Sequence, residues 1–217
     1  MAKNFSIYQC TNSDCQLRFP AISENEIHGW CPKCKSPLLL VYSYSEERTI
    51  FPAQGKINFP LHLSIFLDNI RSVYNVGSIL RSADGFKIDH VYLCGITATP
   101  NEPKIHKTGL GAEIVGFWSY SANSLLKAKD LKKEGKYLIG LECCLGSKPI
   151  FELRPPLLKK EIVLVLGNEL AGIDPQVRQI CDEMICIPMQ GNKSSFNVTI
   201  AFGIAAFYIY YVCQKGI

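Results

Sequence analysis

The chain has 217 residues, 47% of them hydrophobic, and its mean hydropathy is +0.09. This composition argues against intrinsic disorder and suffices for one packed domain, or for one domain with a small added module. The formal net charge of +4 fits a polyanionic partner without indicating one. The N-terminal residues lack the apolar segment of a signal peptide, so the ten cysteines indicate metal ligands and buried thiols rather than disulfides. We therefore expect a cytoplasmic protein.

Two pairs of cysteines stand out in the N-terminal region, flanked by strand-like segments at residues 5–9 and 38–43. They are Cys10, Cys15, Cys31 and Cys34. A unit of this size buries too little apolar surface to be stable unaided. Four thiolates at this spacing predict a tetrahedral Zn²⁺ site, and we expect residues 1–45 to form a zinc-ribbon-like domain. All four ligands come from the protein, so the predicted ion is structural.

Residues 46–60 are polar and irregular and predict a linker to a larger domain at 61–217. In that domain apolar runs alternate with helical patterns, which predicts an α/β fold with a mainly parallel sheet. The expected strands are 61–67, 90–95, 115–120, 137–142, 161–166 and 184–188. The expected helices are 76–86, 124–133, a short helix after Asp174 and a closing helix at 196–211, with a polar connection at 104–111. Asn75 and Asp174 are the expected N-caps of the helices that follow them.

The closing helix is almost free of charge and apolar nearly all round. It is too short for a confident membrane span, which takes about 20 apolar residues. Such a helix is otherwise buried in a core or against a partner. The polar residues 190–197 in front of it lie where helical N–H groups are free, a position suited to binding a ligand.

Three polar clusters follow expected strands, at residues 68–84, 166–174 and 187–197. Open α/β sheets bind ligands at the carboxyl ends of their strands, so these clusters are the candidate site. The sequence has no glycine-rich dinucleotide fingerprint, no phosphate loop and no nucleophile elbow. The four histidines show no spacing typical of a metal site or a catalytic triad.

In their order and spacing, the three clusters resemble the three motifs of the SpoU/TrmH branch of the SPOUT RNA methyltransferases. The resemblance covers about residues 61–213, and the stretch 107–113 resembles the segment between the first two motifs. It implies a trefoil knot in the C-terminal half, a homodimer formed through the closing helices, and S-adenosylmethionine as methyl donor. It also implies transfer of the methyl group to a ribose 2′-hydroxyl of tRNA or rRNA, with tRNA slightly favoured.

The resemblance assigns roles to single residues. The catalytic set that it implies is Arg81, Asn75, Glu169, Ser195 and Asn197. The cofactor-binding set that it implies is Gly167, Asn168, Ile187, Met189, Ser195 and Phe196. Phe196 departs from the family, in which leucine is commoner, but it keeps an apolar wall.

Methyl transfer to a hydroxyl requires an aligned nucleophile and removal of its proton, but no metal. Arg81 matches the family's catalytic arginine, yet a guanidinium stays protonated in proteins and is a poor base. Either a nearby RNA phosphate assists Arg81 as a base, or Arg81 clamps a phosphate and so positions the ribose. The sequence leaves both roles open.

Each assignment has a plainer alternative. Arg81 fits a solvated helix face, Glu169 fits a helix dipole, and Ser195 and Asn197 fit a helix cap. The alternative function is a non-catalytic RNA-binding protein that retains the knotted fold. The ribbon, with Lys33 and Lys35 at its second cysteine pair, either docks RNA or stabilises the fold and dimer. Residues 1–50 carry five basic and five acidic side chains, so the ribbon is not a strongly basic arm.

Overall fold

The structure is a computed structural model that describes residues 6–21, 29–43, 61–111, 117–154 and 161–215. The chain divides into two compact units, residues 1–57 and 58–217, which we describe separately. The predicted linker at 46–60 lies outside the described residues, and the predicted domain boundaries stay a prediction. Within the described residues, no helix combines the length and hydropathy needed to cross a membrane.

The first unit is a small antiparallel sheet with strand order β2-β1-β3. Its strands are β1 (Ser6–Cys10), β2 (Arg18–Ala21) and β3 (Leu38–Ser43). The two segments predicted as strands became β1 and β3, whereas β2 was not predicted. Pro20 in the middle of β2 weakens a strand prediction, but a proline is tolerated in an edge strand such as this one.

The second unit contains a seven-stranded sheet in which every described strand pair is parallel. The strand order is β6-β5-β4-β9-β7-β10-β8. The strands are β4 (Leu63–Asp68), β5 (Val91–Cys94), β6 (Trp118–Ser121), β7 (Tyr137–Leu141), β8 (Lys148–Pro149), β9 (Ile162–Leu166) and β10 (Glu183–Cys186). The predicted α/β class with a mainly parallel sheet is confirmed. The two-residue β8 is too short to show a periodicity and was missed.

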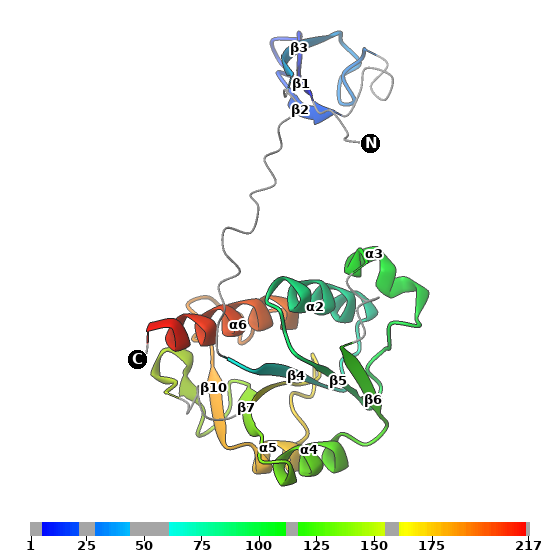
Figure 1. The fold of residues 1–217 in the computed structure, drawn as a ribbon. Coiled ribbons are helices and arrows are strands. Elements are labelled where there is room, and N and C mark those ends of the chain that lie inside the picture. The colour runs from blue at the N-terminus through cyan, green and yellow to red at the C-terminus, as the bar shows by residue number, and fades with distance from the viewer. Residues whose placement is uncertain (1–5, 22–28, 44–60, 112–116, 155–160, 216–217) are drawn as a thin grey trace. The chain divides into compact units, whose positions relative to one another are not determined.

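Helices cover both faces of this sheet (Figure 1). They are α2 (Val73–Gly85), α3 (His106–Gly109), α4 (Ser124–Lys133), α5 (Pro175–Ile180) and α6 (Val198–Lys215), with single 3₁₀ turns at Pro103–Ile105 and Ile150–Glu152. On one face α2 and α6 close a core that includes Ile79 and Phe202. On the other face α4 and α5 close a second core that includes Leu131 and Val177. The central strands β4 and β9 are buried on both faces, which explains why their sequences are mostly apolar.

One local prediction was wrong. Asn75 is not the N-cap of α2, because the helix begins earlier and the Ser72 hydroxyl accepts the N–H of Asn75 at 3.3 Å. The connection predicted at 104–111 contains a 3₁₀ turn and the short helix α3. By contrast, α4 has the predicted bounds, and Asp174 caps α5 through its side chain as predicted.

The parallel arrangement brings the carboxyl ends of the strands to one edge of the sheet. The ends of the neighbouring strands β4, β9, β7 and β10 therefore lie side by side there. The predicted trefoil knot stays a prediction, since strand order does not describe how the chain threads.

Candidate active site

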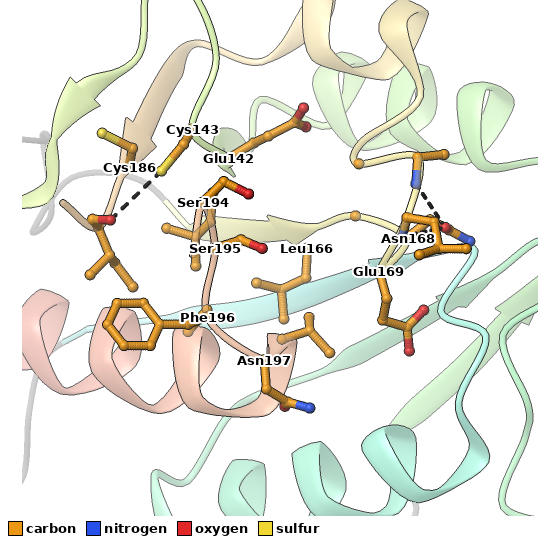
Figure 2. Close-up of a pocket in the computed structure, with 18 residues that line it drawn as sticks. Glu142, Cys143, Leu166, Asn168, Glu169, Cys186, Ser194, Ser195, Phe196 and Asn197 are labelled. Atoms are coloured by element: carbon orange, nitrogen blue, oxygen red, sulfur yellow. Dashed lines mark hydrogen bonds between the residues drawn. The ribbon is translucent and has the colours of Figure 1, made fainter. Parts of the chain in front are cut away.

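A pocket of about 520 Å³ opens at the carboxyl ends of β7, β9 and β10, beside the first turn of α6 (Figure 2). This volume lies in the range typical of small-molecule sites. The residues that line the pocket come from four segments: Leu141–Cys143, Leu166–Gly172, Cys186–Ile187 and Ser194–Val198 with Ala201. The second and third polar clusters of the sequence thus meet around one cavity.

The loop after β9 forms one wall of the pocket and folds back on itself. Asn168 and Gly172 exchange two backbone hydrogen bonds of 2.9 Å, and Gly172 has a φ of +75°, which favours glycine. A side chain at Gly167 would meet the backbone nitrogen of Ile173 at 2.2 Å. The Asn168 amide also donates to the carbonyl of Asn69 at 2.7 Å, which ties the loop to the end of β4. Only glycine fits at 167 because the returning backbone occupies the space of a side chain.

Glu169 projects from this loop and accepts three hydrogen bonds from the start of α2. Its carboxylate accepts the backbone N–H groups of Arg71 (2.8 Å) and Ser72 (3.0 Å) and the side-chain amide of Asn75 (2.8 Å). Burial alone would raise the pKa of the Glu169 carboxyl, but these donors outweigh burial and the pKa is lowered. Glu169 is therefore an ionised carboxylate at neutral pH, seated on a helix N-terminus.

Asn75 connects Glu169 to the third cluster. Its side-chain nitrogen donates to Glu169, while its side-chain oxygen accepts the amide of Asn197 at 3.3 Å. Asn197 precedes α6 and caps it, because its side-chain oxygen accepts the N–H of Thr199 at 2.8 Å. The Glu169 and Asn197 side chains point to the same side, towards α2 (Figure 2). Three predicted catalytic residues from three separate motifs are thus linked by hydrogen bonds.

The remaining predicted residues divide between the pocket and its surroundings. Those that line the pocket are Gly167, Asn168, Ile187, Ser195 and Phe196. Met189 is partly buried but lies outside the lining. Arg81 is exposed on α2, six residues beyond Asn75 and hence about 9 Å further along the helix axis. Among the described residues, Arg81 has no hydrogen-bond or ion-pair partner, so its guanidinium is available to a ligand.

Two carboxylates that support the site were missed from the sequence. Asp68 is buried at the end of β4 and accepts the backbone N–H of Asp174 at 2.7 Å. Glu142 lines the pocket and accepts the backbone N–H of Ile173 at 2.8 Å, with Arg178 at 3.6 Å. Asp68 directly follows a predicted strand, and Glu142 is the last residue of another. This position at a strand end was the sequence feature that could have identified them as site residues. They fix two adjacent residues at the C-terminal end of the segment between β9 and α5.

The cysteines outside the first unit are not all core thiols, as the sequence suggested. Cys94 is buried, but Cys143 is exposed and lines the pocket together with Cys186. The Cys143 thiol donates to the carbonyl of Ile187 at 3.6 Å. Cys143 lies two residues beyond the end of β7 at Leu141, so it is not part of the buried strand.

The charge of the pocket is negative. Of the described residues that line it, only Glu142 and Glu169 are charged, and both are acidic. Apolar walls from Leu166 and Phe196 and the backbone at Gly167 complete the lining. Such a pocket suits a ligand with a flat apolar part and a positive charge, since opposite charge in a partly buried site is favourable.

In the first unit the four predicted metal ligands lie together. The sulfur atoms of the four cysteines all lie within 4.8 Å of one another, with Cys10 and Cys34 at 3.3 Å and Cys15 and Cys31 at 3.8 Å. Tetrahedral Zn–S bonds of about 2.3 Å require sulfur separations of about 3.8 Å. The donor set and its spacing therefore fit a zinc ion.

Known proteins have sequences similar to that of the larger unit. Residues 62–207 match the SpoU rRNA Methylase family. The tRNA (guanosine(18)-2′-O)-methyltransferase of Aquifex aeolicus (strain VF5) is 32% identical over 144 residues, which are 65% of this chain and 65% of that protein. The 23S rRNA (guanosine-2′-O-)-methyltransferase RlmB of Nitrosomonas europaea is 30% identical over 146 residues, which are 67% of this chain but only 54% of that protein. The chain thus spans less than two thirds of the length of these relatives.

Solved structures share the fold. The A. aeolicus TrmH/SpoU tRNA modifying enzyme has a TM-score of 0.62 at 29% identity, over 71% of this chain and 77% of that one. An AdoMet-bound rRNA methyltransferase from Sinorhizobium meliloti has a TM-score of 0.62 at 23% identity, over 69% of this chain and 56% of that one. The family match spans more than half of the chain, and the resemblance read from the three motifs is confirmed. The chain belongs to the SpoU rRNA methylase family.

Proposed function

We propose that this protein is an S-adenosylmethionine-dependent methyltransferase that methylates a ribose 2′-hydroxyl of tRNA or rRNA. The observation that carries the proposal is the acidic pocket joined to the hydrogen-bonded set of Asn75, Glu169 and Asn197. The names of its relatives support the reaction, since one is a tRNA and the other a 23S rRNA (guanosine-2′-O)-methyltransferase. We favour tRNA as the first substrate to test.

The pocket residues fit the methyl donor. Gly167, Ile187, Ser195 and Phe196 would hold it, and the nearby carboxylates suit its positive charges. Bound S-adenosylmethionine would supply an electrophilic methyl group on a sulfonium centre. A structural relative with bound AdoMet supports this cofactor for the fold.

The chain's own residues supply position and charge. Glu169 accepts three hydrogen bonds and so fixes the start of α2 against the pocket. The hydrogen bond between Asn197 and Asn75 fixes the N-terminus of α6 to α2. Arg81 lies outside the pocket with no protein partner among the described residues. That placement favours the role of a phosphate clamp that orients the ribose, because a guanidinium binds phosphate through two parallel hydrogen bonds.

Calorimetric titration with S-adenosylmethionine separates this function from a non-catalytic RNA-binding protein with the same fold. We expect saturable binding at one site per chain, and absence of binding would favour the alternative.

Arg81→Ala should keep the binding of S-adenosylmethionine but lose methyl transfer to bulk tRNA and rRNA. Arg81→Lys should have intermediate activity, because lysine keeps only the charge. Unchanged transfer by Arg81→Ala would remove Arg81 from the mechanism.

Two further proposals concern assembly and metal. The exposed apolar side chains of α6 and its lead-in form one stripe at helical spacing, and we propose that it is a homodimer surface. They are Phe196, Ile200, Ile204, Phe207 and Tyr211.

The four clustered cysteines are proposed to hold one structural zinc ion. Metal analysis of the purified protein should find about one zinc per chain, reduced by Cys34→Ser, and a metal-free ribbon would refute the site.

A further inference from the structure

The sheet of the first unit has one closed and one open face. Directly opposed residues of antiparallel strands share a face, so the pairing of Tyr8 with Phe19 and with Leu40 places these three side chains together. Tyr8 is only 5% exposed, and Cys10, two residues further along β1, is buried and belongs to the four-cysteine cluster. Cys10 places the four-cysteine cluster at one end of this closed face, on which Leu40 is still 45% exposed.

The alternate residues of the same strands form the open face. Gln9 pairs with Arg18 on β2 and with Leu39 on β3, and Ile7 pairs with Pro20 and, beyond a bulge, with Tyr42. The open face is thus the set of Ile7, Gln9, Arg18, Pro20, Leu39 and Tyr42. Leu39 is 60% exposed and Tyr42 is 55% exposed. Arg18 also donates to the Gln9 amide oxygen at 3.3 Å, which holds its guanidinium above the face.

Trp30 extends this surface at one end. An antiparallel bridge places Trp30 opposite Pro37, which lies two residues before Leu39 and hence on the same side of the chain. Trp30 is 56% exposed. Two aromatic rings therefore stand at the two ends of the open face, roughly 15 Å apart along β3 at about 3.3 Å per residue.

Charge indicates what this surface binds. The described residues of the first unit include the cations Arg18, Lys33 and Lys35 and the acid Asp14, while residues 1–50 as a whole carry five basic and five acidic side chains. Lys33 and Lys35 lie in the turn between Trp30 and its bridge partner Pro37, so two exposed cations are close in the chain to the Trp30 ring. Exposed aromatic rings on an open sheet, flanked by cations, are the arrangement that stacks unpaired nucleobases and contacts their phosphates. Unpaired RNA offers stacking faces and negative charge together, and so matches both the aromatic rings and the cations.

We propose that the open face with Trp30 binds single-stranded RNA, with unpaired bases stacked on Trp30 and Tyr42 and the backbone held by Arg18 and the two lysines. This rests on the proposed RNA substrate of the larger unit. The ribbon then recognises unpaired nucleotides of the substrate, and the pocket of the other unit performs the chemistry. A duplex does not fit, because its bases are already stacked on each other.

Trp30 itself is the reporter for the test. The chain has two tryptophans, so full-length zinc-loaded protein with Trp118→Phe emits from Trp30 alone. Titration with a short oligouridylate should quench this emission in a saturable way, and the same strand annealed to oligoadenylate should not. No quenching, or equal quenching by the duplex, would overturn the proposal.

Variants on the two faces of β3 provide the matched control. Tyr42→Leu and Leu39→Ser, both on the open face, should weaken oligouridylate binding, the first by roughly 5- to 100-fold as expected for the loss of one stacked base. Leu40→Ser changes a neighbouring residue on the closed face and should leave the affinity unchanged. Zinc content, measured for each variant, shows that the ribbon is folded. Equal losses for Leu39→Ser and Leu40→Ser, at full zinc content, would also overturn the proposal.

Two parallel measurements separate this proposal from the others. Methyl transfer to bulk RNA by the Trp118→Phe protein tests the larger unit, so activity without quenching of Trp30 refutes the ribbon proposal only. Quenching without methyl transfer supports the ribbon proposal and refutes the enzymatic one. Sedimentation of Trp30→Leu tests a protein partner: a change in oligomeric state would show that this face is a protein interface and would contradict RNA binding.

Discussion

At the scale of single residues, Asn75 has a different role in the structure from the one that the sequence predicted, and the difference bears on the site. A polar residue near a helix start is usually a cap, and the sequence predicted that role. Ser72 caps the helix instead, which releases the Asn75 side chain to join Glu169 and Asn197. The motif resemblance identified these three residues, but their hydrogen bonds join positions 94 and 122 residues apart in the chain, and no local pattern reports such contacts.

Glu169→Gln should lower the free energy of unfolding of the larger unit by about 1 kcal/mol at pH 7, because charged acceptors bind N–H groups more strongly than neutral ones. The pKa of Glu169 is lowered in the folded state, so the carboxylate stabilises the fold above its unfolded pKa of about 4.3. This contribution is lost as the pH falls through the lowered folded pKa. Denaturation followed by Trp118 fluorescence, in a Trp30→Phe background, should therefore show a deficit at pH 7 that shrinks in acid. A deficit independent of pH would contradict the ionised role.

Asn197 has two functions that substitutions can separate. Asn197→Asp keeps the oxygen that caps α6 but removes the amide that reaches Asn75. We expect near-normal stability and methyl transfer about tenfold slower, the equivalent of one lost hydrogen bond. Asn197→Ala should lose the same activity and also about 1 kcal/mol of stability through the missing cap. Full activity of the aspartate variant would show that the link to Asn75 is dispensable.

At the scale of elements, the loop between β9 and α5 shapes the pocket. Asn168 and Gly172 close it on themselves, Glu142 holds its end at Ile173, and Asp68 holds the start of α5. The elements on either side were predictable because strong local signals define them: a buried apolar run before the loop, and an Asp–Pro start after it. The returning path of the loop was not predictable, since it depends on contacts with β4 and β7.

Gly167→Ala tests that returning path. The added methyl group would lie 2.2 Å from the backbone nitrogen of Ile173, so the loop must move. We expect a loss of about 3 kcal/mol in unfolding free energy and weakened binding of S-adenosylmethionine, measured by denaturation and calorimetry. Gly85→Ala is the control, because nothing lies within 4 Å of the new group at the end of α2. It should leave binding unchanged; equal effects at both glycines would contradict the tight loop.

At the scale of the whole molecule, a parallel sheet brings three distant motifs to one edge. Alternating apolar runs and helices predicted that class, and the motifs predicted most of the pocket lining. Two things lay beyond the sequence. One is the open face of the ribbon, which depends on the unpredicted β2 and on strand register. The other is the position of Arg81 outside the pocket, which depends on where α2 begins.

The stripe on α6 makes a prediction about assembly. Phe207 is 65% exposed at its centre, and burial of such side chains favours association. Phe207→Glu should therefore shift the protein from dimer to monomer in analytical ultracentrifugation. Leu145→Glu, at a fully exposed apolar residue outside α6, is the matched control and should sediment like the parent protein. A dimer that survives Phe207→Glu would place the interface elsewhere.

The most direct test of the central claim is mass spectrometry of nucleosides after reaction with S-adenosylmethionine carrying a deuterated methyl group. Purified protein is incubated with tRNA and with rRNA, and the digested products are compared with those of Arg81→Ala. We predict a labelled 2′-O-methylnucleoside that is absent with the variant. Label on a base instead of the ribose, or no label in either RNA, would contradict it.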